Sequence, residues 1–177
     1  MAIRLIAVDM DGTCVDSRHR VPEKNIWALE QALKAGITVV PATGRPLNGY
    51  PTEIRSLAGI RYVISSNGAR LTDLQTGRDL RRALIPDRAA AAFLRGLRGT
   101  GVWVSVHKDG VCIDKHAVPW IHRRLFYGGD FAGNKRIAGL ERWLERQTGG
   151  VEKLQVFVLT PAARRRMEEL LRKWPQL

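Results

Sequence analysis

Short apolar runs alternate with helix-like stretches in the first part of the chain. The runs at 3–9, 37–41 and 62–65 are short and apolar, which indicates buried strands. Apolar residues recur at helical spacing over 22–36, and a second helix is expected over 47–58. The order strand, helix, strand, helix, strand predicts a parallel sheet with right-handed crossovers.

The pattern changes after residue 68, where alternating runs are joined by turn residues. Gln75-Thr76-Gly77 and Lys108-Asp109-Gly110 each separate two such runs, which predicts two hairpins. A strand is expected over 154–159, and helices are expected over 87–98, 119–126, 140–147 and 161–174. Hairpins with helices beside them predict a small α+β lobe after the parallel sheet.

The three predicted strands of the parallel sheet each end in polar residues. Asp9 and Asp11 follow the first strand, Thr43-Gly44-Arg45 follows the second, and Asn67 follows the third. Ligands of open parallel sheets bind beyond the carboxyl ends of the strands, and neighbouring strands lie about 4.8 Å apart. These groups can therefore meet one small ligand. Two carboxylates so close together destabilise the fold unless a cation or a proton shares the site.

This set of polar groups suits phosphoryl transfer. Hydroxyl and amide donors surround phosphate oxygens well, and carboxylates are natural ligands of magnesium. An aspartate can act as a nucleophile that forms an acyl phosphate, and a second carboxyl can protonate the leaving oxygen and later activate water. Gly12 gives the loop the freedom to bring backbone amides to the phosphate.

Composition and charge narrow the class of protein. The net charge of +12 favours anionic partners, but the arginines are scattered and no aromatic-interleaved basic patch argues for nucleic-acid binding. No apolar run approaches the roughly 20 residues that a membrane span needs, and the chain starts directly in a strand pattern rather than a secretory signal. Cys14 and Cys112 are expected to be reduced thiols, so we expect a cytoplasmic protein.

Three segments resemble motifs of a known family. Asp9-Met10-Asp11-Gly12-Thr13 resembles the first motif of the haloacid dehalogenase-like hydrolases. Thr43-Gly44-Arg45-Pro46 and Ser66-Asn67-Gly68-Ala69 resemble segments of the Cof-type phosphatase branch of that family. The resemblance implies an α/β fold with a Rossmann-like parallel-sheet core over 1–86 and an α+β cap domain over 87–177.

The resemblance also implies roles for the matched residues. Asp9 would be the nucleophile and a magnesium ligand, and Asp11 the general acid/base with its backbone carbonyl on the metal. Thr43 would bind the phosphoryl group, with Arg45 and Asn67 near phosphate or substrate. The other residues expected around phosphate or substrate are Met10, Gly12 and Gly44. The implied activity is magnesium-dependent hydrolysis of a small phosphorylated metabolite through an aspartyl phosphate.

Two further motifs of the family lack good counterparts in the sequence. The third motif supplies a lysine and the fourth a Gly-Asp followed by Asn-Asp, whereas Gly129-Asp130 with Asn134 has the wrong order. An alternative is therefore a truncated, weakly active or inactive relative that acts as a binding or interaction module or needs a partner chain. The first strand is then expected to lack a neighbour on one side, and this exposed core sheet would allow homo-oligomers to form.

Overall fold

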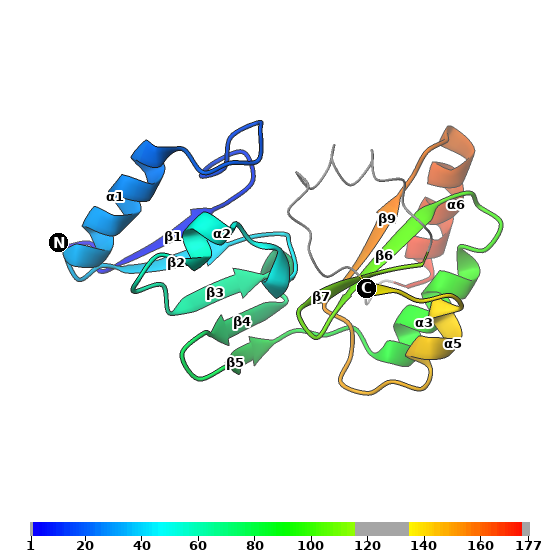
Figure 1. Cartoon of the computed structure of the whole chain (residues 1–177). Coiled ribbons are helices and arrows are strands. Elements are labelled where there is room, and N and C mark those ends of the chain that lie inside the picture. Colours follow the sequence, from blue (N-terminus) through cyan, green and yellow to red (C-terminus); the bar gives the residue numbers. More distant parts are fainter. Residues whose placement is uncertain (1, 116–134, 175–177) are drawn as a thin grey trace. The chain divides into compact units, whose positions relative to one another are not determined.

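The computed structural model describes residues 2–115 and 135–174 (Figure 1). The described residues divide into two compact units, a first unit up to Ala83 and a second unit from Leu84 onwards. The predicted helix at 119–126 lies outside the described residues. In the described part of the chain, no helix combines the length and the apolar content that a bilayer crossing requires.

The first unit contains a five-stranded mixed sheet in the order β1-β2-β3-β4-β5. The first three strands are parallel, and β4 and β5 form an antiparallel hairpin on β3, so the α/β fold class is confirmed. The strands are β1 (Leu5–Asp9), β2 (Thr38–Ala42), β3 (Tyr62–Ser65), β4 (Arg70–Asp73) and β5 (Arg78–Arg82).

Helices of the first unit pack on one face of this sheet. Leu29 of α1 (Glu23–Lys34) and Ile54 of α2 (Thr52–Arg55) share one buried cluster with Val39 and Val63 of the strands. The single helix predicted over 47–58 is wrong. Pro51 lacks an N–H and separates a 3-10 turn, η1 (Leu47–Gly49), from the four-residue α2.

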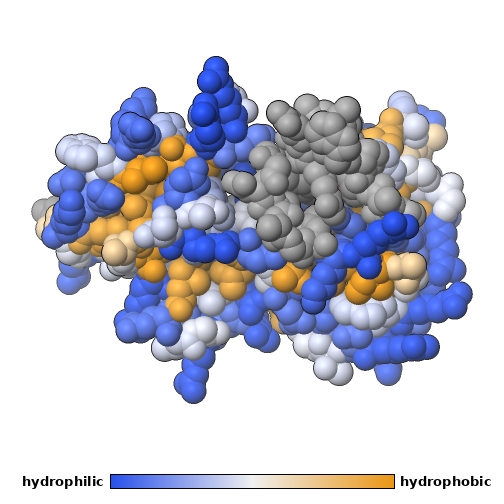
Figure 2. All heavy atoms as spheres, viewed as in Figure 1, coloured by the Kyte–Doolittle hydropathy of each residue, from blue (hydrophilic) through white to orange (hydrophobic). Residues whose placement is uncertain are grey.

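The opposite face and the outer edge of the sheet are more open. Within the described residues β1 pairs only with β2, and Leu5 of β1 is 58% exposed. Figure 2 shows hydrophobic residues reaching the surface over the part of the first unit that holds β1 and α1. The β5 edge differs, because it presents the exposed arginines Arg78, Arg81 and Arg82, and charged side chains deter pairing with other strands.

The second unit contains a four-stranded sheet in the order β8-β7-β6-β9. Both predicted hairpins are present: β4 pairs antiparallel with β5 in the first unit, and β6 (Trp103–Lys108) pairs antiparallel with β7 (Val111–Asp114) in the second. The strands are β6 (Trp103–Lys108), β7 (Val111–Asp114), β8 (Lys135–Arg136) and β9 (Lys153–Phe157), and the helices are α3 (Asp87–Gly96), α5 (Leu140–Leu144) and α6 (Pro161–Arg172).

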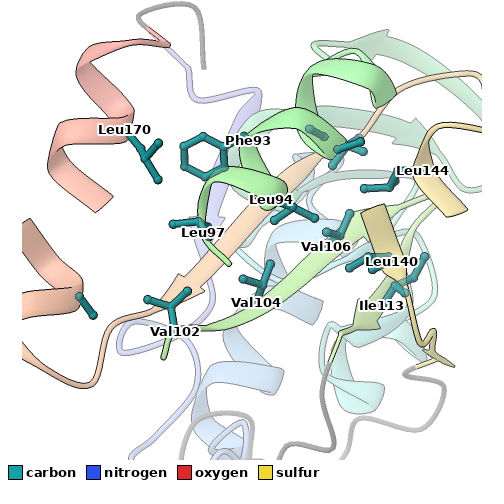
Figure 3. Close-up of a cluster of buried hydrophobic side chains, with 14 residues drawn as sticks. Phe93, Leu94, Leu97, Val102, Val104, Val106, Ile113, Leu140, Leu144 and Leu170 are labelled. Carbon is teal, nitrogen blue, oxygen red and sulfur yellow. The ribbon is translucent and has the colours of Figure 1, made fainter. Parts of the chain in front are cut away.

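The two faces of the second sheet differ in character. Leu94, Val106 and Leu140 meet in the apolar cluster between this sheet and its helices (Figure 3). Ser105 and His107 alternate with the apolar residues of β6 and are also buried. Burial, reinforced by the nearby charge of Lys153, lowers the pKa of His107 from 6.5 to about 3, so the imidazole is neutral in the folded protein.

A buried ion pair joins three segments of the second unit. Lys108 Nζ donates to Asp87 Oδ1 at 2.9 Å and to the carbonyl oxygens of Thr148 at 2.9 Å and Gly150 at 2.8 Å. Asp87 Oδ2 in turn accepts from the Gly150 N–H at 2.7 Å. All three ammonium donors therefore have acceptors, as a buried charge requires. The pair fixes the start of α3 to the β6–β7 hairpin and to the loop before β9.

Candidate active site

A tight turn follows β1 and presents the first motif. The carbonyl oxygen of Met10 accepts hydrogen bonds from the backbone N–H groups of Thr13, Cys14 and Val15 at 3.3, 3.0 and 2.8 Å. Gly12 has a φ of +83°, in the left-handed region that a residue with a Cβ enters only at a cost. The Met10 side chain is fully buried and anchors this turn to the core.

Main-chain hydrogen bonds bring the three strand ends together. Each joins a residue at the end of one strand to a residue at the end of a neighbouring strand. The donor and acceptor pairs are Met10 N with Ala42 O at 3.2 Å, Thr43 N with Ile64 O at 2.9 Å, Ser66 N with Arg45 O at 2.8 Å and Asn67 N with Thr43 O at 3.2 Å. The predicted residues of the three motifs thus lie together at the carboxyl ends of β1, β2 and β3, which form one edge of the first sheet. Hydrogen bonds between backbone groups hold them there.

The carboxylate of Asp9 is exposed at this edge. Its Oδ2 accepts a hydrogen bond from the Thr13 hydroxyl at 2.9 Å, which restrains the side chain without covering it. We did not predict this contact, although the hydroxyl four residues after Asp9 was a signal for it. Asp9 is therefore accessible to a ligand that approaches the carboxyl end of β1.

Asp11 is held by a guanidinium group. Arg45 Nε lies 3.1 Å from each carboxylate oxygen of Asp11, and Arg45 Nη2 lies 2.6 Å from Asp11 Oδ1. The arginine side chain is only 7% exposed, whereas that of Asp11 is 48% exposed. Arg45 Nη1 also donates to the carbonyl oxygen of Gly49 at 3.2 Å, and its backbone N–H donates to Thr43 Oγ1 at 3.1 Å. Asp11, Arg45 and Thr43 therefore form one connected set.

The loop after β3 adopts an unusual backbone. Ser66 and Asn67 both have positive φ, at 51° and 59°, and Gly68 follows at 88°. Consecutive left-handed residues are rare outside glycine and cluster at ligand-binding loops. Asn67 is exposed, and Gly44 is half-buried on the loop that faces it through the hydrogen bond from Asn67 N to Thr43 O. The loop is thus held in place while the Asn67 side chain stays open to solvent.

Cys14 is not a rival nucleophile. Burial raises the pKa of its thiol, so sulfur stays protonated and unreactive at neutral pH. Cys14 and Cys112 are both buried and neither is in a disulfide, and the side chain of Cys14 packs in the apolar core of the first unit.

Metal ligands at the site are few. Across residues 2–115 and 135–174, no group of three or more His, Cys, Asp or Glu side chains is placed to hold a metal ion. The Asp11 carboxylate already pairs with Arg45, whereas the contact described for the Asp9 carboxylate is with the Thr13 hydroxyl, so Asp9 is the better candidate for a metal ligand. Magnesium is commonly held by one or two carboxylates together with water and substrate phosphate oxygens. The oxygens present fit that kind of shared site rather than an all-protein cage.

Comparison with known proteins identifies the class. The model of the haloacid dehalogenase-like hydrolases, named Hydrolase_3, matches residues 6–136, which is most of the chain. The chain therefore belongs to the haloacid dehalogenase-like hydrolases, and the resemblance of its motifs is confirmed.

Particular relatives are phosphatases by name. Phosphatase YwpJ of Bacillus subtilis (strain 168) is 36% identical over 104 residues, which are 59% of this chain and 36% of the relative. HMP-PP phosphatase of Klebsiella pneumoniae (strain 342) is 30% identical over 126 residues, 71% of this chain and 46% of the relative. A haloacid dehalogenase-like hydrolase from Bacteroides thetaiotaomicron, at 18% identity, superposes with a TM-score of 0.80 over 99% of this chain and 65% of its own. The chain spans less than half the length of these two curated relatives.

Proposed function

We propose that this chain acts as a magnesium-dependent phosphatase, which hydrolyses a small phosphorylated metabolite through an aspartyl phosphate. The observation that carries the proposal is the meeting of Asp9, Asp11 and Thr43 at one sheet edge in a member of this family. The names of relatives, which include HMP-PP phosphatase, support a small phosphorylated substrate.

Each residue has a defined part in the proposed reaction. A carboxylate oxygen of Asp9 attacks phosphorus, and the bond between phosphorus and the leaving oxygen breaks while Asp11 gives that oxygen a proton. Water then attacks the phosphorus of the aspartyl phosphate, and Asp11 takes the proton that water loses. The phosphorus–oxygen bond to Asp9 breaks, which releases inorganic phosphate and restores the carboxylate. The Thr43 hydroxyl can donate to a phosphoryl oxygen during both steps.

Magnesium would be held by the Asp9 carboxylate, the backbone carbonyl of Asp11 and oxygens of the phosphate. When bound, the ion would offset the negative charge of the phosphoryl oxygens. Thr13 would restrain the orientation of the Asp9 carboxylate, since the Thr13 hydroxyl donates to Asp9 Oδ2 at 2.9 Å. Asn67 and Gly44 would line the substrate side of the same edge.

The test is release of phosphate from p-nitrophenyl phosphate in the presence of magnesium. We expect Asp9→Asn to abolish turnover while the circular dichroism spectrum and the unfolding midpoint stay unchanged, because the amide keeps the shape but is not a nucleophile. Asp109→Asn is the matched control, since Asp109 is an exposed aspartate of the second unit far along the chain from the motifs. Equal turnover by wild type and Asp9→Asn would refute the proposal.

A second candidate is a phosphate-binding module without turnover. The observation that favours it is the engagement of Asp11 by Arg45, together with the small number of described metal ligands. Titration calorimetry with inorganic phosphate and magnesium separates the two functions. Binding in a protein that releases no phosphate from any monoester would support the module, whereas turnover lost in Asp9→Asn would exclude it.

A further inference from the structure

Arg45 is the most firmly fixed cation at the candidate active site. Its guanidinium uses Nε and Nη2 on the Asp11 carboxylate and Nη1 on the carbonyl oxygen of Gly49. Its backbone N–H donates to Thr43 Oγ1, and its own carbonyl oxygen accepts from Ser66 N at 2.8 Å. Main chain and side chain are therefore both tied to the frame of the site.

We propose that Arg45 is a positioning residue for Asp11 rather than a ligand of the phosphoryl group, an inference that rests on the proposed function. A buried, fork-shaped guanidinium fixes the direction of the half-exposed carboxylate it holds, because a bidentate pair constrains angle as well as distance. A guanidinium offers donors and no acceptor, so Arg45 is not the group that takes a proton from water. Its effect on catalysis is to orient the Asp11 carboxylate, which transfers the proton.

The geometry weighs against direct binding of phosphate by Arg45. Three of its five N–H donors are engaged by Asp11 and by the Gly49 carbonyl, and the side chain is only 7% exposed, so turning the guanidinium toward a ligand would take a buried charge away from its partners, which is costly. Thr43 is also buried, but its Oγ1 accepts from the Arg45 backbone N–H, so its hydroxyl can still donate to another acceptor. The arginine thus supports two candidate residues through one set of contacts.

The first experiment compares two leaving groups in the wild type, Arg45→Lys and Arg45→Met. An alkyl phosphate such as glycerol phosphate needs its leaving oxygen protonated, whereas the p-nitrophenolate of an aryl phosphate leaves readily without a proton. General acid catalysis contributes about 10²–10⁴-fold, so we expect Arg45→Met to lose about 100-fold or more in kcat/KM on the alkyl substrate. The loss of kcat/KM on the aryl substrate should stay below about 10-fold, because kcat/KM reports only the steps up to the aspartyl phosphate and excludes its later hydrolysis, in which Asp11 acts as base for both substrates.

Arg55→Met is the matched control for this experiment. Arg55 is exposed, donates to the carbonyl oxygen of Asn48 at 2.8 Å and stacks on Tyr50 at 4.8 Å from the ring centroid. It lies on the same connecting segment as Arg45, and none of the contacts described for it involves Asp11, so we expect its kcat/KM to match the wild type on both substrates. An equal loss of kcat/KM on alkyl and aryl phosphates in the Arg45 variants would overturn the proposal.

The second experiment needs no turnover. The Nε–H resonance of Arg45 is observed by ¹⁵N NMR in the wild type and in Asp11→Asn, each with and without inorganic phosphate and magnesium. We expect Asp11→Asn to shift the signal strongly and phosphate to leave it in place. A signal that follows phosphate and ignores Asp11→Asn would overturn the assignment. Wild-type protein that hydrolyses neither substrate would instead refute the proposed function, while this spectrum still decides whether Arg45 holds Asp11.

Discussion

The buried pair of Lys108 and Asp87 offers the sharpest test of the packing of the second unit. Lys108 is 2% exposed and Asp87 6% exposed, and the ammonium makes three hydrogen bonds of 2.8–2.9 Å. Lys108→Met keeps the length of the side chain and removes the charge. Removing one partner of a buried pair costs about 3–5 kcal/mol, because it leaves an uncompensated charge in the interior. The variant should therefore lose a large share of the roughly 5–15 kcal/mol that stabilises a typical domain.

The double variant separates the charge from the shape. In Lys108→Met with Asp87→Asn, the amide oxygen can still accept from the Gly150 N–H that now meets Asp87 Oδ2 at 2.7 Å. The stranded carboxylate is gone, so we expect this protein to recover about 1–2 kcal/mol relative to Lys108→Met alone. The measurement is urea-induced unfolding followed by tryptophan fluorescence, with the free energy of unfolding taken from the transition of the second unit.

An exposed pair provides the control for this series. Arg164 and Glu168 lie four residues apart on α6 at 3.0 Å, with side chains 74% and 46% exposed. Arg164→Met should cost no more than about 0.5 kcal/mol, since exposed helical pairs contribute little. The reasoning fails if Lys108→Met costs as little as Arg164→Met, or if the double variant is less stable than Lys108→Met.

Other predictions follow from local contacts. His107 has a folded-state pKa of about 3 against an ordinary 6.5, so below pH 6.5 the unfolded state binds more protons and stability falls with pH down to about 3. Urea unfolding at several pH values should show this slope weakened in His107→Gln, and an unchanged slope would contradict the assignment. Gly150→Ala should lower the unfolding midpoint more than Gly77→Ala, because both have positive φ but only at Gly150 would a Cβ lie 2.8 Å from Leu84 Cβ. Thr13→Val should lower the kcat of phosphate release severalfold by freeing the Asp9 carboxylate, with thermal unfolding unchanged, since Thr13 is exposed.

Much of the first unit could be predicted from the pattern of the sequence. The runs that became β1, β2 and β3 are apolar and bounded by turn residues, and parallel pairing then brings Asp9, Thr43 and Asn67 to one edge. Local rules sufficed for β2 and β3 because a strand that is largely covered needs an apolar run whatever its neighbours are, and β1 has such a run although its residues are exposed or half-buried in the described structure. The family followed from the same residues, since its motifs occupy these strand ends.

The features that the sequence could not show depend on the directions of side chains and on the point where a helix is interrupted. Arg45 was expected near phosphate, but which acceptor a long side chain finds is decided by the loop around Gly49, which no periodicity describes. The helix expected over 47–58 was interrupted at Pro51, a residue whose effect depends on where the helix would begin. The burial of His107 on the polar face of β6 depends on the register of the strand, which the sequence pattern does not show.

The exposed position of β1 has a consequence for how tightly any ligand can bind. Asp9 ends this strand and Asp11 follows it, yet in the described structure only β2 supports it by hydrogen bonds, and Leu5 faces solvent. Amide hydrogens of β1 should therefore exchange faster than those of β2, because lightly packed segments open locally at low cost. A phosphoryl ligand that demands a fixed Asp9 must then also order the strand, and its apparent affinity falls by the fraction of molecules in which β1 is already in place. Whatever stabilises β1 would, by the same thermodynamic linkage, tighten ligand binding without touching the ligand.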